Sequence, residues 1–280
     1  MKRHRNTLYV TTQGAYLGSE GECVVLRVDH EERMRLPLHL LEGIVCFGLV
    51  SCSPPLMASC AERNVCISFL SEHGRFLARV EGPTSGNVLL RRQQYRVSDD
   101  AGKSAAIART FVLAKLANSR TVLLRSLRDH PDAAGSADVR RAADRLGQHL
   151  CAAPQESDLD RVRGIEGEAA SEYFAVFDHL LVAKNGFAFS GRSRRPPLDP
   201  LNALLSFVYT ILTHDARSAL ESVGLDPQVG FLHRDRPGRP SLALDLIEEL
   251  RPVLADRLVL SLTNRHQVSV KGFKTGETGG

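Results

Sequence analysis

The sequence predicts an α+β protein in which a small amino-terminal β-rich domain precedes a larger all-α domain. Residues 1–85 consist of short apolar runs separated by turn residues, whereas residues 101–280 repeat apolar residues at helical spacing. The chain has 280 residues, of which 43% are hydrophobic and 24% charged, as in ordinary folded proteins. Residues 86–100 are expected to be a linker between the domains.

The first 85 residues show the pattern of about seven short strands. Gln13-Gly14 is a turn signal and predicts a hairpin between residues 7–10 and 15–18. A second hairpin is expected between residues 23–28 and 33–36. Three further strands are expected at residues 43–48, 65–70 and 75–80, and a short helix opened by Pro54-Pro55 at residues 56–63.

The second part of the chain shows the periodicity of amphipathic helices. Phe111, Val112 and Leu116 exemplify the apolar spacing in the first of them. A proline inside such a pattern interrupts a helix, and Pro252 is expected to do so in the last one. The predicted helices cover residues 105–127, 137–151, 158–177, 200–223 and 241–262.

Charge and composition exclude some classes of protein. The net charge of +4 and the pI near 8.8 permit nucleic-acid binding without requiring it. No apolar run is long enough to span a bilayer, and no signal peptide is recognisable at the amino end. The six cysteines form no Cys-x-x-Cys pair, so we expect small buried side chains in a reducing cytoplasm rather than a zinc site.

Three polar patches in the helical part contain residues suited to catalysis or metal binding. In the first, the small residues Gly167 and Ala170 are expected to let a neighbour approach closely beside Glu166. In the second, His233 follows directly after an apolar run and stands at the start of an Arg/Pro-rich loop, as expected of a histidine held in a fixed position. In the third, Asp245 and Glu248 lie three residues apart on a predicted helix, so both point to one face.

One imidazole with two or three carboxylates suits a divalent cation that prefers oxygen but accepts nitrogen, such as Mg²⁺ or Mn²⁺. Each patch also has an ordinary explanation. A single Glu near a helix start is usually a solvated residue or a cap, and acids near a helix amino terminus complement its dipole. From spacing alone, the metal site therefore remains a hypothesis.

The three patches together resemble the signature of the CRISPR-associated spacer-integration endonucleases, the larger of the two universal CRISPR adaptation proteins. That family has a Gly-hydrophobic-Glu-Gly helix, then a Gly-Phe-hydrophobic-His loop, then an Asp with an acidic residue three positions later. Residues 164–167, residues 230–233 and the pair Asp245/Glu248 match in this order. The resemblance extends to residues 86–92, 115–120 and 195–206. Within the family, the sequence resembles the members from type I-C systems.

The resemblance implies that Glu166, His233 and Glu248 are metal ligands and that Asp245 is an auxiliary catalytic acid or supporting group. The family often has Asp where this chain has Glu248, so the ligand could be shared with, or shifted to, Asp245. The implied metal is Mg²⁺ or Mn²⁺. The all-α domain would then be the catalytic domain.

The implied reaction is a transesterification in which the 3′-hydroxyl of a short DNA duplex attacks a phosphodiester at the CRISPR repeat. With water as the nucleophile, the same site would be a metal-dependent endonuclease. The implied partners are double-stranded DNA, a second copy of the chain through the β-rich domain, and a small adaptation protein that completes a hetero-hexamer. Family chains run beyond the position of Gly280, so the chain is expected to be truncated at its carboxy end.

Basic residues in two predicted loops are candidates for phosphate contacts, although a solvated loop explains them equally well. These residues are Arg192, Arg194, Arg195, Arg234, Arg236 and Arg239.

Other functions fit the same residues. A nuclease that cuts branched or single-stranded DNA in repair would use the same site, and only its products would differ. A DNA-binding scaffold with an inactive site would bind DNA irrespective of His233. A metal-dependent hydrolase of small molecules fits less well, because it would need a closed apolar pocket.

Overall fold

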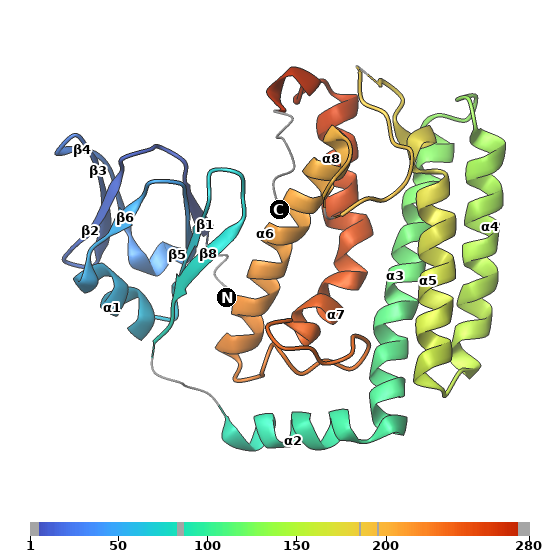
Figure 1. The fold of residues 1–280 in the computed structure, drawn as a ribbon, viewed down its shortest axis with the longest axis horizontal. Coiled ribbons are helices and arrows are strands. Elements are labelled where there is room, and N and C mark those ends of the chain that lie inside the picture. Colours follow the sequence, from blue (N-terminus) through green and yellow to red (C-terminus); the bar gives the residue numbers. More distant parts are fainter. Residues whose placement is uncertain (1–5, 83–86, 185, 195, 274–280) are drawn as a thin grey trace. The chain divides into compact units, whose positions relative to one another are not determined.

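A computed structural model describes residues 6–82, 87–184, 186–194 and 196–273. The chain divides into two compact units, Met1–Asn87 and Val88–Gly280. The first is rich in strands, and the described part of the second contains helices and no strand (Figure 1). The predicted α+β organisation is therefore confirmed.

The described part of the first unit contains eight strands, one more than the predicted seven, and one helix. Ser53 caps this helix, because its Oγ accepts a hydrogen bond from the Leu56 amide at 3.2 Å and prolines occupy the first turn. The elements are β1 (Asn6–Val10), β2 (Tyr16–Glu20), β3 (Cys23–Val28), β4 (Glu31–Pro37), η1 (Leu38–Leu40), β5 (Leu41–Phe47), β6 (Ser51–Cys52), α1 (Pro54–Glu62), β7 (Cys66–Leu70) and β8 (Phe76–Val80).

The strands form two four-stranded sheets, in the orders β1-β5-β7-β8 and β4-β3-β2-β6. The hairpin expected around residues 29–32 is present as the antiparallel pair β3–β4. The hairpin expected around Gln13-Gly14 is wrong, because β1 pairs in parallel with β5 and β2 with β3 in the other sheet. The Gln13 side chain explains the difference: it bonds to Phe47 O at 3.1 Å and Leu49 N at 2.7 Å, so the turn is tied to the end of β5.

The second unit is built of helices. α3, α5 and α4 stand side by side, and α2 lies across the beginning of α3 (Figure 1). The helices and short helical segments are α2 (Val88–Asp99), α3 (Ala101–Asp129), α4 (Ser136–Ala152), η2 (Ala153–Gln155), α5 (Leu159–Ala175), η3 (Phe177–Leu180), α6 (Pro200–Ser222), α7 (Ser241–Leu250), η4 (Arg251–Asp256), α8 (Arg257–Asn264) and η5 (Val270–Gly272).

Two helical features differ from the expectation. The segment 86–100, expected as a linker, is mostly the helix α2, because the buried Gln94 anchors it with bonds from its side-chain nitrogen to Asp226 O and Val229 O at 2.8 and 2.9 Å. The interruption expected at Pro252 is present, but as the π-helical segment η4 rather than a break. π-Helical turns re-aim side chains and are frequent at functional sites, and η4 directly continues the helix that carries Asp245 and Glu248.

The cysteines follow the expectation only in part. All six are free thiols, but only Cys46 and Cys60 are fully buried, and Cys151 is exposed. Burial raises the pKa of the Cys60 thiol to about 12, as suits a small hydrophobic side chain. None of the described helices is both long and apolar enough to cross a membrane.

Candidate active site

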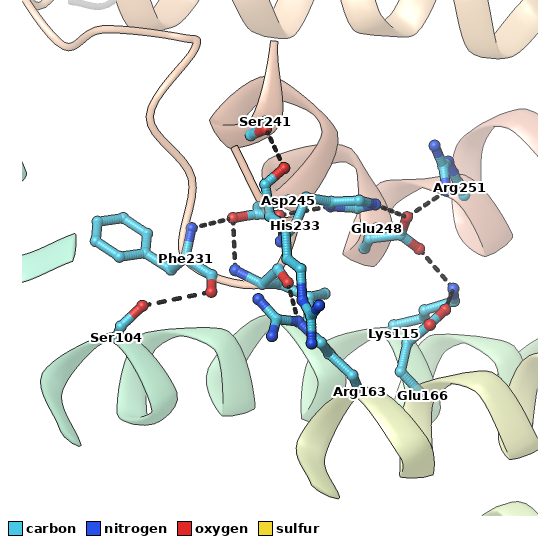
Figure 2. A network of polar contacts seen from close by, with 12 residues as sticks. Ser104, Lys115, Arg163, Glu166, Phe231, His233, Ser241, Asp245, Glu248 and Arg251 are labelled. Carbon is cyan, nitrogen blue, oxygen red and sulfur yellow. Dashed lines mark hydrogen bonds and ion pairs between the residues drawn. The ribbon is translucent and has the colours of Figure 1, made fainter. Parts of the chain in front are cut away.

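The four acidic and imidazole residues singled out in the sequence converge in the helical unit (Figure 2). Glu166 lies on α5, Asp245 and Glu248 lie on α7, and His233 lies in the loop between α6 and α7. The His233 ring is the centre of the group. Its Nδ1 lies 2.6 Å from Oδ1 of Asp245, and its Nε2 lies 3.8 Å from Oε1 of Glu248.

Asp245 holds the loop that carries His233. Its fully buried carboxylate accepts backbone hydrogen bonds from Phe231 at 2.6 Å, from Leu232 at 2.9 Å and from His233 at 2.9 Å. An ionised carboxylate can only accept hydrogen bonds, so Nδ1 of His233 carries the hydrogen in the fourth contact. When the ring is neutral, the lone pair is then on Nε2, which faces Glu248.

Gly230 lets the loop come this close to α7. A Cβ at this position would lie 2.8 Å from the backbone carbon of Ser241 and 2.9 Å from Oδ2 of Asp245, closer than real side chains come. The loop is also tied to neighbouring helices, since Arg163 Nε donates to Leu232 O at 2.6 Å. The Gly-Phe-hydrophobic-His pattern thus has a structural reason: its glycine and its backbone amides fit the carboxylate of Asp245.

Glu248 is 2% exposed and is held between two cations. The Lys115 Nζ lies 2.5 Å from Oε2, and the Arg251 guanidinium contacts Oε1. Burial acts to raise the pKa of Glu248, but Arg251 and Lys115 outweigh it and lower the pKa to about 2. Glu248 is therefore a charged group at neutral pH despite its burial.

Lys115 on α3 joins the two helices that carry the acids. Its ammonium contacts Glu166 as well as Glu248, so one cation bridges two carboxylates. Burial acts to lower the pKa of Lys115, but the charges of Glu248 and Glu166 raise it above its ordinary value. Neither Lys115 nor Arg251 is among the residues that the sequence motifs predict for the site. A signal was present for Lys115, which continues the buried stripe of α3 at the 4-3-4-3 spacing of Ala108, Val112, Ser119 and Val122.

The fit of these residues to a divalent cation depends on Lys115. In the described ranges, no three His, Cys, Asp or Glu side chains lie close enough together to hold an ion, because the Lys115 ammonium separates Glu166 from Glu248. The donor set nevertheless suits an ion such as Mg²⁺ or Mn²⁺, since two carboxylates already share a cation and Nε2 of His233 faces one of them. The Asp245 carboxylate already accepts hydrogen bonds from the backbone amides of the loop, so it is not counted among the ligands. Glu166, His233 and Glu248 are thus the groups that fit.

A second buried acid lies on the carboxyl side of α7. Asp256, at the end of η4, is 1% exposed and accepts a hydrogen bond from the Tyr209 hydroxyl at 2.5 Å. The buried Tyr173 hydroxyl lies near the same carboxylate but has no partner of hydrogen-bond geometry among the described residues. Burial raises the pKa of Asp256 to about 6. The Arg251 guanidinium lies 4.9 Å over the Tyr209 ring, so this cluster adjoins Glu248.

The candidate DNA-binding arginines divide into two groups. Arg192 is engaged internally, with bonds to Asn202 Oδ1 at 2.7 Å and Ser206 Oγ at 3.1 Å and its guanidinium 5.3 Å over the Tyr209 ring. A contact of Arg192 with phosphate is therefore not supported, because both of its terminal nitrogens bond to groups of the chain and its Nε is buried. Arg234 pairs with Asp160 at 3.1 Å.

The other arginines are more available. Among the described residues, Arg194, Arg236 and Arg239 have no acidic side chain within ion-pair distance. Burial and the charges of Arg236 and Arg194 lower the pKa of Arg239, so these cations repel one another. Such a positive group is typical of an anion-binding surface. Arg195 lies outside the described residues.

The interpretation of Gly167 as a point of close approach is wrong. A Cβ at Gly167 would meet nothing within 4 Å, and the same holds for Gly164. The small residues flanking Glu166 therefore face open space rather than a neighbouring helix. Glu166 itself is 25% exposed, so part of its side chain is accessible to solvent.

Comparison with known proteins identifies the family of the chain. The family model described as "CRISPR associated protein Cas1" matches residues 8–280. The chain belongs to the Cas1 family. The resemblance drawn from the sequence motifs is therefore confirmed at the level of the family, whereas the type I-C assignment is not shown.

Individual Cas1 proteins are similar over nearly the whole chain. The "CRISPR-associated endonuclease Cas1 1" of Chlorobaculum tepidum is 56% identical over 100% of this chain and 82% of its own length. The "CRISPR-associated endonuclease Cas1 2" of Rhodospirillum rubrum is 55% identical over 98% of this chain and 80% of its own length. The solved structure of a Cas1 protein from Thermotoga maritima has a TM-score of 0.81 and 26% identity, with 98% of this chain and 84% of that chain covered. The chain is thus an enzyme of the Cas1 endonuclease family.

Proposed function

We propose that this Cas1-family enzyme integrates new spacers into a CRISPR array, by joining the 3′-hydroxyl ends of spacer DNA to the repeat through transesterification. The convergence of Glu166, His233 and Glu248 on an accessible side of the helical unit is the observation that carries the proposal. With water in place of the 3′-hydroxyl, the same residues would support endonucleolytic cleavage.

Glu166, His233 and Glu248 would hold a Mg²⁺ or Mn²⁺ ion. When bound, such an ion stabilises the charge that develops on the phosphate and activates the attacking oxygen. Asp245 keeps the His233 ring in one orientation and one tautomer, and Arg251 keeps Glu248 ionised. Asp245 is therefore proposed as a supporting group rather than as a ligand, which favours Glu248 in the choice that the sequence leaves open.

DNA binding is proposed for Arg194, Arg236 and Arg239. Arg236 and Arg239 follow His233 closely in the chain, and their mutual repulsion would be relieved by phosphate groups. Arg234 is paired with Asp160, so a phosphate contact would have to replace this ion pair, and Arg195 stays a candidate outside the described residues.

The assembly is proposed from the family resemblance and from the surface of the β-rich unit. Several large apolar side chains on the two sheets of that unit are exposed, and a second copy could cover some of them. They include Tyr9, Tyr16, Met34 and Leu77. We propose a homodimer through this unit, a hetero-hexamer with a small adaptation partner, and a type I-C-like system. The six free cysteines agree with a cytoplasmic location.

Strand joining tests the proposal. Supercoiled plasmid carrying a CRISPR repeat and a short duplex with 3′-hydroxyl ends would be incubated with Mn²⁺, Mg²⁺ or EDTA. The wild type is expected to give joined product that requires the metal, and His233→Ala is expected to give none. His73→Ala, an exposed histidine in the β-rich unit, is the matched control and is expected to behave as wild type.

The products also separate the alternatives. Nicks without joined strands, in the presence of the small partner, would favour a repair nuclease on branched or single-stranded DNA. DNA binding that is unaffected by His233→Ala, with no metal-dependent product, would favour an inactive scaffold.

A further inference from the structure

Lys115 is a cation in a place where cations are rarely found. It lies on the buried stripe of α3 and its side chain is 13% exposed. A lysine so placed is costly unless acids compensate its charge, and Lys115 has two, Glu166 and Glu248. Figure 2 shows the ammonium reaching toward both carboxylates from α3. The bridge joins Lys115 to Glu166, which lies 51 positions later in the sequence, and to Glu248, which lies 133 positions later.

The same two carboxylates are the proposed metal ligands. A divalent ion bound by both would occupy the region that the ammonium occupies, and two cations in direct contact there would repel each other strongly. Metal binding and the Lys115 bridge are therefore mutually exclusive. Without either cation, the two carboxylates would face each other with Arg251 on Glu248 as the remaining compensating charge, although Glu248 is almost fully buried.

Arg251 cannot take the same part. Its guanidinium contacts the other oxygen of Glu248 and is packed over the Tyr209 ring, 4.9 Å from the centroid. Within the described part of the chain, Glu248 is the acid with which Arg251 forms an ion pair, and Glu166 is not. Lys115, by contrast, is a compact charge on a flexible four-carbon stem that can reorient without moving the backbone.

We propose that Lys115 holds Glu166 and Glu248 together before the metal binds, leaves them when it enters, and then contacts the DNA phosphate through its ammonium. The Glu166 side chain is 25% exposed, so the carboxylate that the ammonium leaves borders solvent. The inference deepens the proposed function and rests on it, because it requires Glu166 and Glu248 to be metal ligands.

The test compares Mn²⁺ affinity, measured by the electron paramagnetic resonance signal of free Mn²⁺, with strand cleavage. Lys115→Met removes the competing charge and is expected to bind Mn²⁺ about tenfold more tightly than wild type or better. Its cleavage rate at saturating Mn²⁺ is expected to fall at least about tenfold, because the ammonium no longer reaches the phosphate. Lys103→Met, an exposed lysine on the same helix, is the control and should change neither quantity.

A merely structural Lys115 would give another result. In that case Lys115→Met would loosen the site, and Mn²⁺ affinity and cleavage would fall together, which overturns the inference. Glu248→Gln and His233→Ala distinguish failure of the inference from failure of the proposed function. If both abolish Mn²⁺ binding while Lys115→Met leaves the affinity unchanged, the metal site stands and the displacement is refuted. If neither affects Mn²⁺ binding, the proposed function itself fails.

A measurement on the wild-type chain covers the case that Lys115→Met does not fold. With ¹³C at the ε-carbon of lysine, the resonance absent from Lys115→Arg identifies Lys115. Saturating Mg²⁺ is expected to shift this resonance and to leave that of Lys103 in place. A Lys115 resonance that does not respond to Mg²⁺ would refute displacement.

Discussion

Two buried acids on one continuous helical stretch behave in opposite ways. Glu248 on α7 and Asp256 at the end of η4 are 2% and 1% exposed, yet their pKa values are about 2 and about 6. The difference lies in their partners, since Lys115 and Arg251 contact Glu248 whereas the Tyr209 hydroxyl contacts Asp256. An acid compensated by cations stays charged and can exchange one cation for another. Asp256, which accepts a hydrogen bond from the Tyr209 hydroxyl, has no cation in ion-pair contact among the described residues that a metal ion could replace.

The largest expected effect concerns the cation-compensated acid. Glu248→Gln removes the charge that Lys115 and Arg251 compensate, so we expect metal-dependent cleavage to fall more than about 100-fold. The measurement is the cleavage rate at several Mn²⁺ concentrations. Glu249→Gln makes the same change one residue away and should keep wild-type activity. Equal cleavage rates for Glu248→Gln and Glu249→Gln would show that the charge of Glu248 has no special part in metal-dependent cleavage.

Asp245 sharpens the comparison as an acid that acts through hydrogen bonds alone. Asp245→Asn replaces an acceptor of four hydrogen bonds by an amide that must present N–H groups to other N–H groups. We expect Mn²⁺ affinity to fall about 10–100-fold, because His233 loses its fixed orientation. Mn²⁺ titrations of Asp245→Asn and Glu248→Gln measure the affinities, and Asp235→Asn, on the exposed loop, is the control for both. A metal affinity abolished as fully as in Glu248→Gln would instead make Asp245 a direct ligand.

Asp256 is expected to affect stability rather than catalysis. Its pKa is higher in the folded state than the ordinary 3.8, so the folded protein binds more protons than the unfolded chain between about pH 4 and pH 6. The contribution of Asp256 to the free energy of unfolding is therefore fully present below pH 4, and it is lost as the pH rises through 6. Asp256→Asn keeps an acceptor for Tyr209 and should raise the free energy of unfolding at pH 7 by about 1–3 kcal/mol.

Urea unfolding at pH 4, 5, 6 and 7 measures this difference. The gain from Asp256→Asn should grow with pH and level off above 6. Glu248 has the opposite sign, since its lowered pKa contributes stability above about pH 4 that is lost as the pH falls toward 2. A gain from Asp256→Asn that is constant with pH would show that burial does not raise the pKa of this acid.

The smallest expected effect lies at the arginines. Replacing Arg236 or Arg239 with Gln should weaken DNA binding and reduce the slope of log affinity against log salt by about 0.9 each, as one phosphate contact is lost. Arg140→Gln, exposed on α4, should leave the slope unchanged. Arg192→Gln should lower the melting temperature instead, because Arg192 binds Asn202 and Ser206. A reduced slope for Arg192→Gln would remove the distinction between the two groups.

Periodicity and motif order carried much of the prediction. The helices of the second unit and the shared face of Asp245 and Glu248 were accessible from spacing along a helix. That His233 joins these acids was expected from the family resemblance. Long-range partners were not. The parallel pairing of β1 with β5 and the internal bonds of Arg192 depend on segments distant in sequence. Lys115 was within reach as a charge in an apolar stripe, but its two acidic partners lie on other helices.

The central claim is that Glu166, His233 and Glu248 hold a divalent ion in the place that Lys115 now bridges. An anomalous difference map from a crystal soaked in Mn²⁺ tests it most directly. We predict a Mn²⁺ peak bound by these three side chains, with the Lys115 ammonium moved away and Asp245 still holding the loop of His233. A peak elsewhere, or no peak with Lys115 still bridging Glu166 and Glu248 at saturating Mn²⁺, would contradict the claim.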